Sequence, residues 1–319
     1  MPITLAEAKV GMADRIVQSV IDEFRRESFI LDRLTFDNAV SPGTGGSTMT
    51  YGYTMLKTPS TAGGRALNTE YTPGEAKRDK KTTDLKIFGG SFEVDRVLEG
   101  TSATSEISFQ LRQKVIATRN DFHNNFVNGD SASQALEFDG VDKLVTGSDT
   151  DVTLASALNV SNMTNIKTNG EALVFELNNL LSLLMRKPDM LLMNKRTLTV
   201  LRTIAYTMGY RTEAEDAFGR KVDAFDGIPM IDAGMYFNGT NSVDVVPIDT
   251  QAGTTAIYPI VLGLDAVHGV SPTGNKLINT YLPDMSRPGA VKKGEVELVA
   301  GLAMKNSRAA GALRGIKVA

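Results

Sequence analysis

Residues 103–128 read ATSEISFQLRQKVIATRNDFHNNFVN, and this stretch carries the clearest structural signal in the chain. Apolar side chains recur in it mostly every four positions: Ile107, Leu111, Val115, Phe122 and Phe126, with Phe109 and Ile116 widening the stripe. That spacing predicts one long amphipathic helix. Its roughly 26 residues would span about 39 Å at the usual rise per residue. The helix ends at Asn128-Gly129-Asp130, a good C-cap, and is long enough to be the axis of an elongated subunit.

The segment from Lys57 to Lys86 is polar and rich in turn-forming residues. Such a length without apolar periodicity is unusual inside a compact domain. Thr48–Thr54 predicts a strand before it, and Leu85–Phe88 with Ser91–Asp95 predicts the strand that returns. We therefore expect a long two-stranded finger. Its surface has to be buried on something outside its own domain, most simply on another subunit.

Six basic residues of this finger are the candidate contact residues: Lys57, Arg65, Lys77, Arg78, Lys80 and Lys81. The last four are interleaved with Glu75, Asp79 and Asp84, and Tyr71 is the one neighbouring aromatic that could stack on a base. This mixture favours the acidic surface of a neighbouring subunit over nucleic acid. We therefore predict inter-subunit contacts at these six positions.

The N-terminal segment is predicted to be an arm with one apolar side. From Leu5 to Phe24 apolar residues recur mostly every four positions, which predicts an amphipathic helix with Thr4 as its candidate cap. The breaker Ser41-Pro-Gly-Thr-Gly-Gly46 then separates this arm from the finger.

A second folded region begins near Thr168. It predicts a helix at 171–185 that Pro188 stops, a short buried strand at 190–193 and a helix at 195–206, which together form an α/β unit. Further strands at 227–231, 243–246 and 257–262 complete a mixed sheet flanked by helices. Strands at 296–299 and 315–318 are expected to return to the body around the long helix. The C-terminus would then pair with material from before residue 150 and make the first domain discontinuous.

Composition narrows the class of protein. With 319 residues the chain is expected to divide into at least two domains or subdomains. A net charge of -3 gives no basic field suited to sequence-reading of nucleic acid, and the absence of cysteine removes disulfides and thiolate chemistry. We find no signal peptide and no uninterrupted apolar run of membrane-spanning length, and therefore expect a cytosolic, non-membrane protein.

Catalytic constellations are scarce. His123 and His268 are the two histidines; the first falls on the long helix and the second in a loop after a buried strand, so they form no metal-binding spacing. Gly43-Thr-Gly-Gly46 lacks the Lys-Ser/Thr ending of a phosphate loop, and Glu213 and Glu215 lie in a polar stretch expected to be a solvated loop. We therefore predict no enzyme activity, no cofactor and no metal.

Several short motifs occur in an order that resembles one known family. The matching segments are Phe88–Asp95 (returning arm of the extended loop), Asn125–Asp130 with Glu137–Gly140 (helix end and turn), Pro188–Asn194 (central-domain strand), Phe225–Met230 (the strand with Gly-Ile-Pro) and Leu313–Lys317 (C-terminal strand). In this order they make the whole chain resemble the major capsid proteins of tailed bacteriophages with the Hong Kong 97-type capsid fold.

The resemblance implies an α+β fold in four parts. These are an N-terminal arm at 1–40, an extended β-hairpin loop at 41–96, a peripheral domain with the long spine helix at 97–150 and 290–319, and an α/β axial domain at 151–289. In the family, the arm and the extended loop lie across adjacent subunits.

The resemblance also implies a function: a major capsid protein that self-assembles through hexamers and pentamers into an icosahedral shell. The shell would enclose packaged double-stranded DNA, which it touches non-specifically, and would assemble in the bacterial host cytoplasm to become the virion capsid. A portal and a decoration protein are further implied partners. Because the chain reaches the arm directly after Met1, we expect a separate scaffolding protein or none.

Other interpretations stay open. Some relatives crosslink a loop lysine to an asparagine of the peripheral domain, and Lys57 and Asn306 are conceivable partners for such a bond. The chief alternative is an encapsulin-like compartment shell that encloses cargo enzymes. An α/β enzyme centred on residues 168–289 and a phage tail or adhesin protein are further alternatives.

Overall fold

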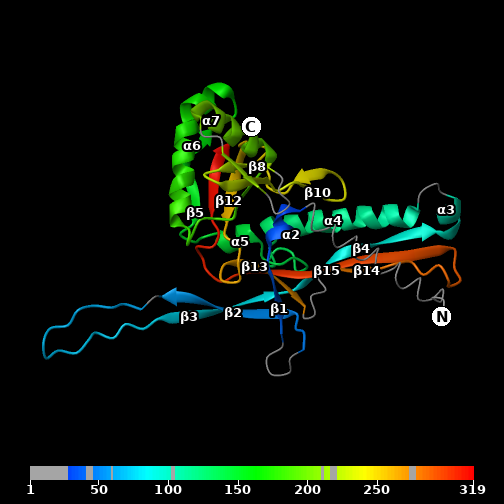
Figure 1. Cartoon of the computed structure of the whole chain (residues 1–319), viewed down its shortest axis with the longest axis horizontal. Helices are drawn as coiled ribbons and strands as arrows, with labels where there is room; N and C mark the ends of the chain where they lie inside the picture. Colours follow the sequence, from blue (N-terminus) through cyan, green and yellow to red (C-terminus); the bar gives the residue numbers. More distant parts are fainter. Residues whose placement is uncertain are drawn as a thin grey trace.

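The computed structural model describes residues 28–40, 46–58, 60–101, 105–209, 212–215, 221–272 and 278–319. It shows an α+β structure with a two-stranded finger, a five-stranded sheet backed by a long helix, and a seven-stranded sheet with two helices against it (Figure 1). The finger and the long helix point in opposite directions from the middle of the molecule (Figure 1). The helix predicted at 5–24 lies outside the described residues.

The described helices are α2 (Phe29–Arg33), α3 (Arg96–Thr101), α4 (Glu106–Asn128), α5 (Val141–Val145), α6 (Met163–Leu183) and α7 (Lys195–Met208). The strands of the first half are β1 (Phe36–Ala39), β2 (Thr50–Thr58), β3 (Lys77–Asp84), β4 (Lys86–Asp95), β5 (Asp151–Asn159) and β6 (Met190–Met193). Those of the second half are β7 (Thr212–Glu215), β8 (Lys221–Phe225), β9 (Ile228–Asp232), β10 (Met235–Phe237), β11 (Ser242–Asp244), β12 (Thr254–Ile260), β13 (Val267–Pro272), β14 (Ile278–Tyr281), β15 (Val291–Met304) and β16 (Ala312–Lys317).

Helix α4 confirms the long helix expected from the sequence. It begins at Glu106, after Ser105, whose hydroxyl accepts the backbone N–H of Ser108 at 3.2 Å as an N-cap. The predicted apolar stripe is buried at Leu111, Val115, Phe122 and Phe126, and the last two are fully enclosed, whereas Phe109, which was predicted to widen the stripe, is 54% exposed. The Phe122 and Phe126 rings pack with Phe138 and with apolar side chains of β4 and β15, so the helix lies against the five-stranded sheet.

The five-stranded sheet is centred on β15. This strand pairs with β4 along residues 291–300 on one side, and with β14 and β13 on the other, while β1 pairs in parallel with β13. The pairing of β15 with β4 confirms that the C-terminal part of the chain joins material from before residue 150. Alternate residues of β4 and β15 are buried, so the sheet has one face in the core and one face turned outward.

The structure contains the expected two-stranded finger, but one of its two strands differs from the prediction. Its returning strand is β3, the charged segment itself, which pairs antiparallel with β2 from Thr50↔Asp84 to Thr58↔Lys77. The sequence prediction that residues 85–95 form this returning strand is wrong, because β4 pairs with β15 in the body. The alternating apolar residues of β4 face the core, whereas β3 has little apolar surface to bury.

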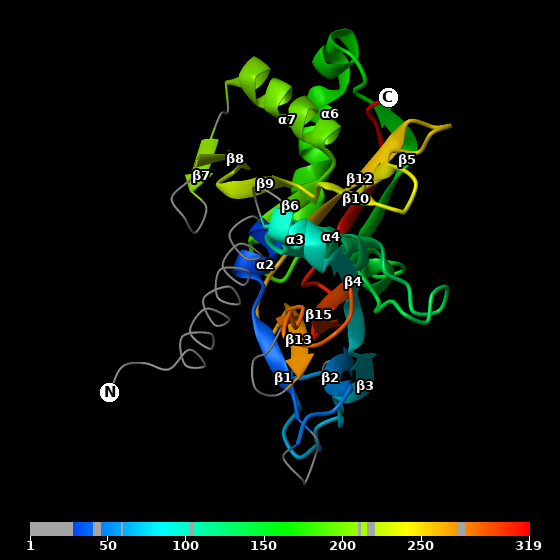
Figure 2. The ribbon, with the colours of Figure 1, turned by 90° about the vertical axis from the view of Figure 1, so that its right-hand side faces the viewer.

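The seven-stranded sheet has the order β5-β16-β12-β6-β9-β8-β7, with α6 and α7 against it (Figure 2). The predicted helix, buried strand and helix at 171–206 are confirmed as α6, β6 and α7, and the predicted loop at Glu213 and Glu215 is strand β7. Strand β11 pairs with β10 in a separate hairpin, so the prediction that it joins the mixed sheet is wrong.

Strand β16 corrects the expected course of the C-terminus. It pairs with β5 and β12 inside the seven-stranded sheet, so the prediction that residues 315–318 return to the long helix is wrong. Its side chains Leu313 and Ile316 are fully buried in one cluster with Leu177 and Leu180 of α6. Burial against that helix explains the placement, because the edge beside the long helix is already occupied by β4 and β15.

Candidate assembly surfaces

The finger has two chemically different faces. Opposite residues of an antiparallel pair point to the same side, so Tyr53 shares a face with Lys81, and Thr54 shares the other face with Lys80. The tyrosine face is buried at its base, where Tyr53 packs with Leu85 and Ala303. The finger is therefore anchored to the body at one end and exposed along the rest of its length.

The six predicted contact residues are distributed over this finger. Lys77, Arg78, Lys80 and Lys81 lie exposed on β3, and Lys57 lies near the end of β2. Arg65 lies in the tip with its guanidinium 5.2 Å from the ring centre of Tyr71. The register places Arg78 and Lys80 on one face, whereas Lys81 lies on the other, 3.9 Å from Asp79. Their contacts with another subunit stay a prediction.

The base of the finger contains a polar cluster that the sequence did not reveal. The Tyr51 hydroxyl donates to Asp37 Oδ2 at 2.6 Å, and its ring meets the buried His268 ring edge-on at 5.8 Å. The hydrogen bond from Tyr51 lowers the pKa of Asp37, and burial lowers the pKa of His268. His268 lies in strand β13, so its predicted loop position is wrong. The three residues come from three different strands, and His268 lies more than two hundred residues after the other two, so no local sequence pattern predicts the cluster.

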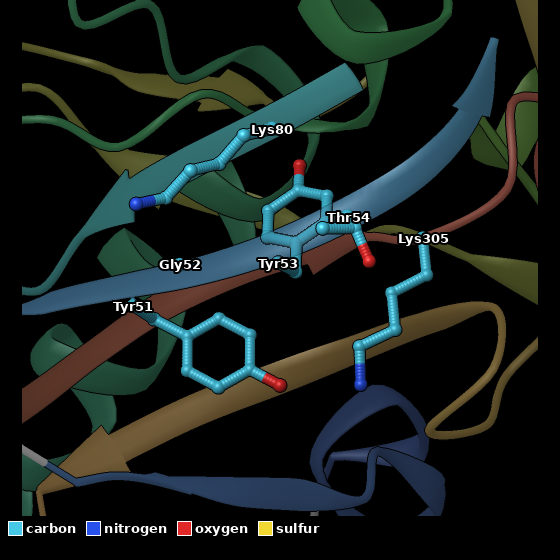
Figure 3. A pocket seen from close by; sticks show the side chains of 6 residues that line it. All are labelled: Tyr51, Gly52, Tyr53, Thr54, Lys80 and Lys305. Atoms are coloured by element: carbon cyan, nitrogen blue, oxygen red, sulfur yellow. The ribbon is translucent and has the colours of Figure 1, made fainter. Parts of the chain in front are cut away.

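A shallow groove of about 370 Å³ lies beside this cluster, lined by Tyr51, Gly52, Tyr53, Thr54, Lys80 and Lys305 (Figure 3). The Lys305 amino group lies 5.7 Å from the Tyr51 ring centre. Lys80 points away from it at the other end of the groove (Figure 3). The groove therefore has a cation at each end and tyrosine between them, which suits contact with a partner surface better than enclosure of a small molecule.

The outward face of the β4–β15 pair is acidic. Register places Glu93 opposite Lys293, Ser91 opposite Glu295 and Gly89 opposite Glu297. Lys293 Nζ forms an ion pair with Glu295 Oε1 at 2.8 Å. A groove of about 290 Å³ crosses this face, lined by Ile87, Phe88, Gly89, Gly90, Ser91, Glu295, Val296 and Glu297. Carboxylates at a hollow in an exposed sheet make this face suited to a cationic partner.

An ion cluster joins the seven-stranded sheet to helix α5. Arg314 of β16 donates to Asp151 Oδ1 at 2.7 Å and lies 2.6 Å from Asp142 Oδ1 of α5, to which the Tyr258 hydroxyl also donates. The Arg314 side chain is 27% exposed. Because α5 follows the long helix and β16 belongs to the seven-stranded sheet, this cluster fastens one folded region to the other.

Metal-binding groups and membrane-spanning helices are both absent from the described part of the chain. No group of histidine and carboxylate side chains there could hold a metal ion, and none of the described helices is long and apolar enough to cross a bilayer.

His123 connects the long helix to α2. Its Nε2 lies 2.6 Å from Ser28 Oγ. The Ser28 oxygen already accepts the Leu31 N–H, so the Ser28 hydroxyl hydrogen is available to the His123 ring. Burial lowers the pKa of His123 to about 3, and this histidine therefore links α2 to α4 in its neutral form.

Neither a protein-family model nor a curated protein matches the sequence. Solved structures are similar over about nine-tenths of the chain. The holo-SrpI encapsulin complex from Synechococcus elongatus is 14% identical over 91% of this chain and 88% of that chain, with a TM-score of 0.61. The capsid of the native GTA particle is 12% identical over 91% of each chain (TM-score 0.57), and a Mycobacterium phage Bobi structure is 13% identical over 90% and 89% (TM-score 0.53).

These likenesses establish the fold. The chain has the α+β Hong Kong 97-type capsid fold, which confirms the fold class expected from the sequence. The division into arm, extended loop, peripheral domain and axial domain stays a prediction, as does the crosslink between Lys57 and Asn306.

Proposed function

We propose that this protein is a structural shell protein, whose function is to self-assemble into a closed particle. The observation that carries the proposal is the fold, shared over about nine-tenths of the chain with an encapsulin and with the capsid of a GTA particle. The finger supports it independently. A projection this long, with apolar burial at its base, gains stability when another subunit covers it.

The finer proposal is a major capsid protein of a tailed phage, built of hexamers and pentamers around packaged double-stranded DNA. The ordered sequence motifs and the phage and GTA structures support it. In this proposal the portal, a decoration protein and a separate scaffolding protein are its partners. The particle then forms in the bacterial cytoplasm and becomes the virion capsid.

An encapsulin-like compartment is the second candidate, because the encapsulin has the same fold at a TM-score of 0.61. Such a shell would enclose cargo enzymes where the phage shell encloses a genome. The two candidates agree on self-assembly and differ in contents.

The deciding experiment is expression of the chain alone and with its neighbouring reading frames, followed by size-exclusion chromatography and negative-stain electron microscopy. Closed particles or capsomer rings are the expected result. Nuclease-protected DNA inside particles would support the phage capsid, and a co-purifying enzyme would support the compartment. A compact monomer under every condition would overturn the shell proposal.

A further inference from the structure

The chain contains three Asn–Gly pairs, at 128–129, 169–170 and 238–239. In such a pair the backbone nitrogen of the glycine can attack the side-chain amide carbon of the asparagine, because glycine has no side chain to hinder the approach. The reaction needs a glycine N–H that is not hydrogen-bonded and an amide nitrogen that can leave. The local structure around each pair therefore decides which of them can react.

The pair at 128–129 is held by the end of the long helix. The Asn128 side-chain nitrogen donates to Val245 O at 2.6 Å and to Asn124 Oδ1 at 2.9 Å. The Gly129 N–H donates to Asn125 O at 3.0 Å. Both groups that would have to react are therefore already bonded.

The pair at 169–170 lies inside helix α6. Asn169 Nδ2 donates to Asn159 O at 2.7 Å. Gly170 is buried, and a Cβ at this position would lie 3.3 Å from Ile204 Cγ1. In the interior of an α-helix the glycine N–H belongs to the hydrogen-bond ladder and the main chain is fixed, so this pair is protected as well.

The pair at 238–239 lies in the exposed turn between β10 and β11 and differs in both respects. Neither the Gly239 N–H nor the Asn238 Nδ2 has a hydrogen-bond partner in the described part of the chain. Asn238 Oδ1 accepts the N–H of Thr240 at 3.0 Å and that of Asn241 at 2.8 Å. These two bonds hold the side-chain amide over the peptide group that follows it.

The two donors also favour the reaction itself. When the Gly239 nitrogen adds to the amide carbon, negative charge develops on Asn238 Oδ1, the atom to which both backbone N–H groups already donate. Gly239 has φ of 93°, a conformation that glycine adopts without strain. The turn therefore holds the amide in the arrangement that its own reaction requires.

We propose that Asn238 is a self-modification site, at which the chain deamidates without an enzyme. The Gly239 nitrogen forms a bond to Asn238 Cγ while the Cγ–Nδ2 bond breaks, and the displaced proton leaves with the nitrogen as ammonia. Water then opens the resulting succinimide ring. Breaking the bond between the ring nitrogen and Cγ gives aspartate, and breaking the bond between that nitrogen and the backbone carbonyl carbon gives isoaspartate.

The product changes the surface of the hairpin, which lies beside α4 (Figure 1). Met235 and Phe237 stand on one face of β10 and are 50% and 65% exposed. A carboxylate at position 238 adds a negative charge next to these apolar side chains, and isoaspartate lengthens the turn by one main-chain atom. Older molecules therefore differ from new ones at this hairpin, independently of the proposed shell function.

Ageing of the full chain near neutral pH tests the proposal. Peptide mass spectrometry measures the gain of about one dalton at each asparagine. We expect the native chain to deamidate at Asn238 at least about tenfold faster than at Asn128 or Asn169. In urea the three rates should converge, because Asn128 and Asn169 lose their bonded partners. A native rate at Asn238 below its own rate in urea, or no faster than at Asn128, would overturn the proposal, because the turn would then protect the amide.

Asn238→Gln and Gly239→Ala provide a second measurement, the ammonia released over a fixed period. Glutamine would have to close a larger ring, and a methyl group at position 239 hinders the attacking nitrogen, so both variants should release less ammonia than the wild type. Asn179→Gln, at an exposed asparagine of α6 that is followed by leucine, is the matched control and should leave the release unchanged. Circular dichroism checks that each variant is folded. Wild-type ammonia release from folded Asn238→Gln would overturn the assignment of the site.

Discussion

The seven-stranded sheet and the finger are built on opposite physical principles. In the sheet, β6 is buried at all four positions between β12 and β9, and its side chains contribute to the cores on the two sides. In the finger, β3 is exposed at most positions, and the apolar cluster lies at its base around Tyr53 and Leu85. One region closes its core within the chain, and the other leaves most of its surface uncovered.

This difference indicates where each region obtains its stability. Burial of apolar side chains is the main favourable term in folding, so the sheet region carries its own stabilisation. An isolated two-stranded hairpin is marginal in water. The finger is therefore expected to become fully ordered through contact with another copy, and substitutions in the two regions should act on different quantities.

The largest effect on the free energy of unfolding is expected from Leu180→Ala in the sheet region. Leu180 is fully buried, and its Cδ1 lies only 2.9 Å from where a Cβ on Gly311 would stand, which indicates tight packing. The loss should be about 2–5 kcal/mol, measured by urea unfolding. Leu183→Ala on the same helix, at a 37% exposed position, should cost much less. Equal losses at both sites would contradict a closed core here.

The next effect concerns the ion cluster that joins the seven-stranded sheet to α5, the short helix that follows the long helix. Arg314→Leu leaves Asp142 and Asp151 close together without their shared cation, and we expect a loss of about 2 kcal/mol, reduced from the fully buried value by partial exposure. Arg308→Leu is the control, because its pair with Asp149 at 3.7 Å is largely exposed and should contribute less than about 0.5 kcal/mol. Thermal unfolding of both variants checks the difference, and an Arg314 loss as small as the control would contradict it.

The same contrast explains what the sequence could predict. Helices α4, α6 and α7 and strand β6 were predictable because their apolar spacing records the burial of one face or of a whole strand. Strand β3 has the sequence KRDKKTTD and was not predicted, because a strand with little contact to the core has no alternating apolar residues. The alternating apolar residues of β4 predict a strand correctly, but they do not predict its partner. Such a pattern shows that one face of a strand is buried and does not show which element covers that face.

The candidate surfaces were predictable only in part. The basic residues of the finger were identified from their position in a long polar segment. The acidic hollow could not be predicted, because Gly89 lies about two hundred residues before Glu295 and Glu297 and becomes their neighbour only through the register of β4 with β15. The same applies to Asp37, Tyr51 and His268, which three strands bring together.

A smaller, pH-dependent effect is expected where α2 meets the long helix. His123 stays neutral in the folded state because its pKa is lowered to about 3, whereas in the unfolded chain it takes up a proton near pH 6.5. Stability is therefore fully present above pH 6.5 and falls as the pH drops toward the folded value, by about 1 kcal/mol between pH 6.5 and 5.5.

The comparison of wild type with His123→Gln isolates this term, since glutamine can still bond to Ser28 and does not titrate. His268 also has a lowered pKa and remains in both proteins. Urea unfolding at several pH values should show a shallower decline in the variant. Parallel declines would mean that His123 is free to protonate in the folded protein.

The smallest effect on unfolding is expected at the finger tip. Leu67 is 88% exposed, so Leu67→Ser removes almost no buried surface within the chain and should change the free energy of unfolding by less than about 0.5 kcal/mol. If the tip is covered by another copy, the same substitution should lower the fraction of protein in particles, because an apolar contact between subunits is lost. Melting temperature and particle yield measured on one preparation separate the two quantities. A lower melting temperature of the unassembled variant would show that the tip stabilises its own chain. An unchanged melting temperature with reduced assembly is the result expected if the tip contacts another subunit.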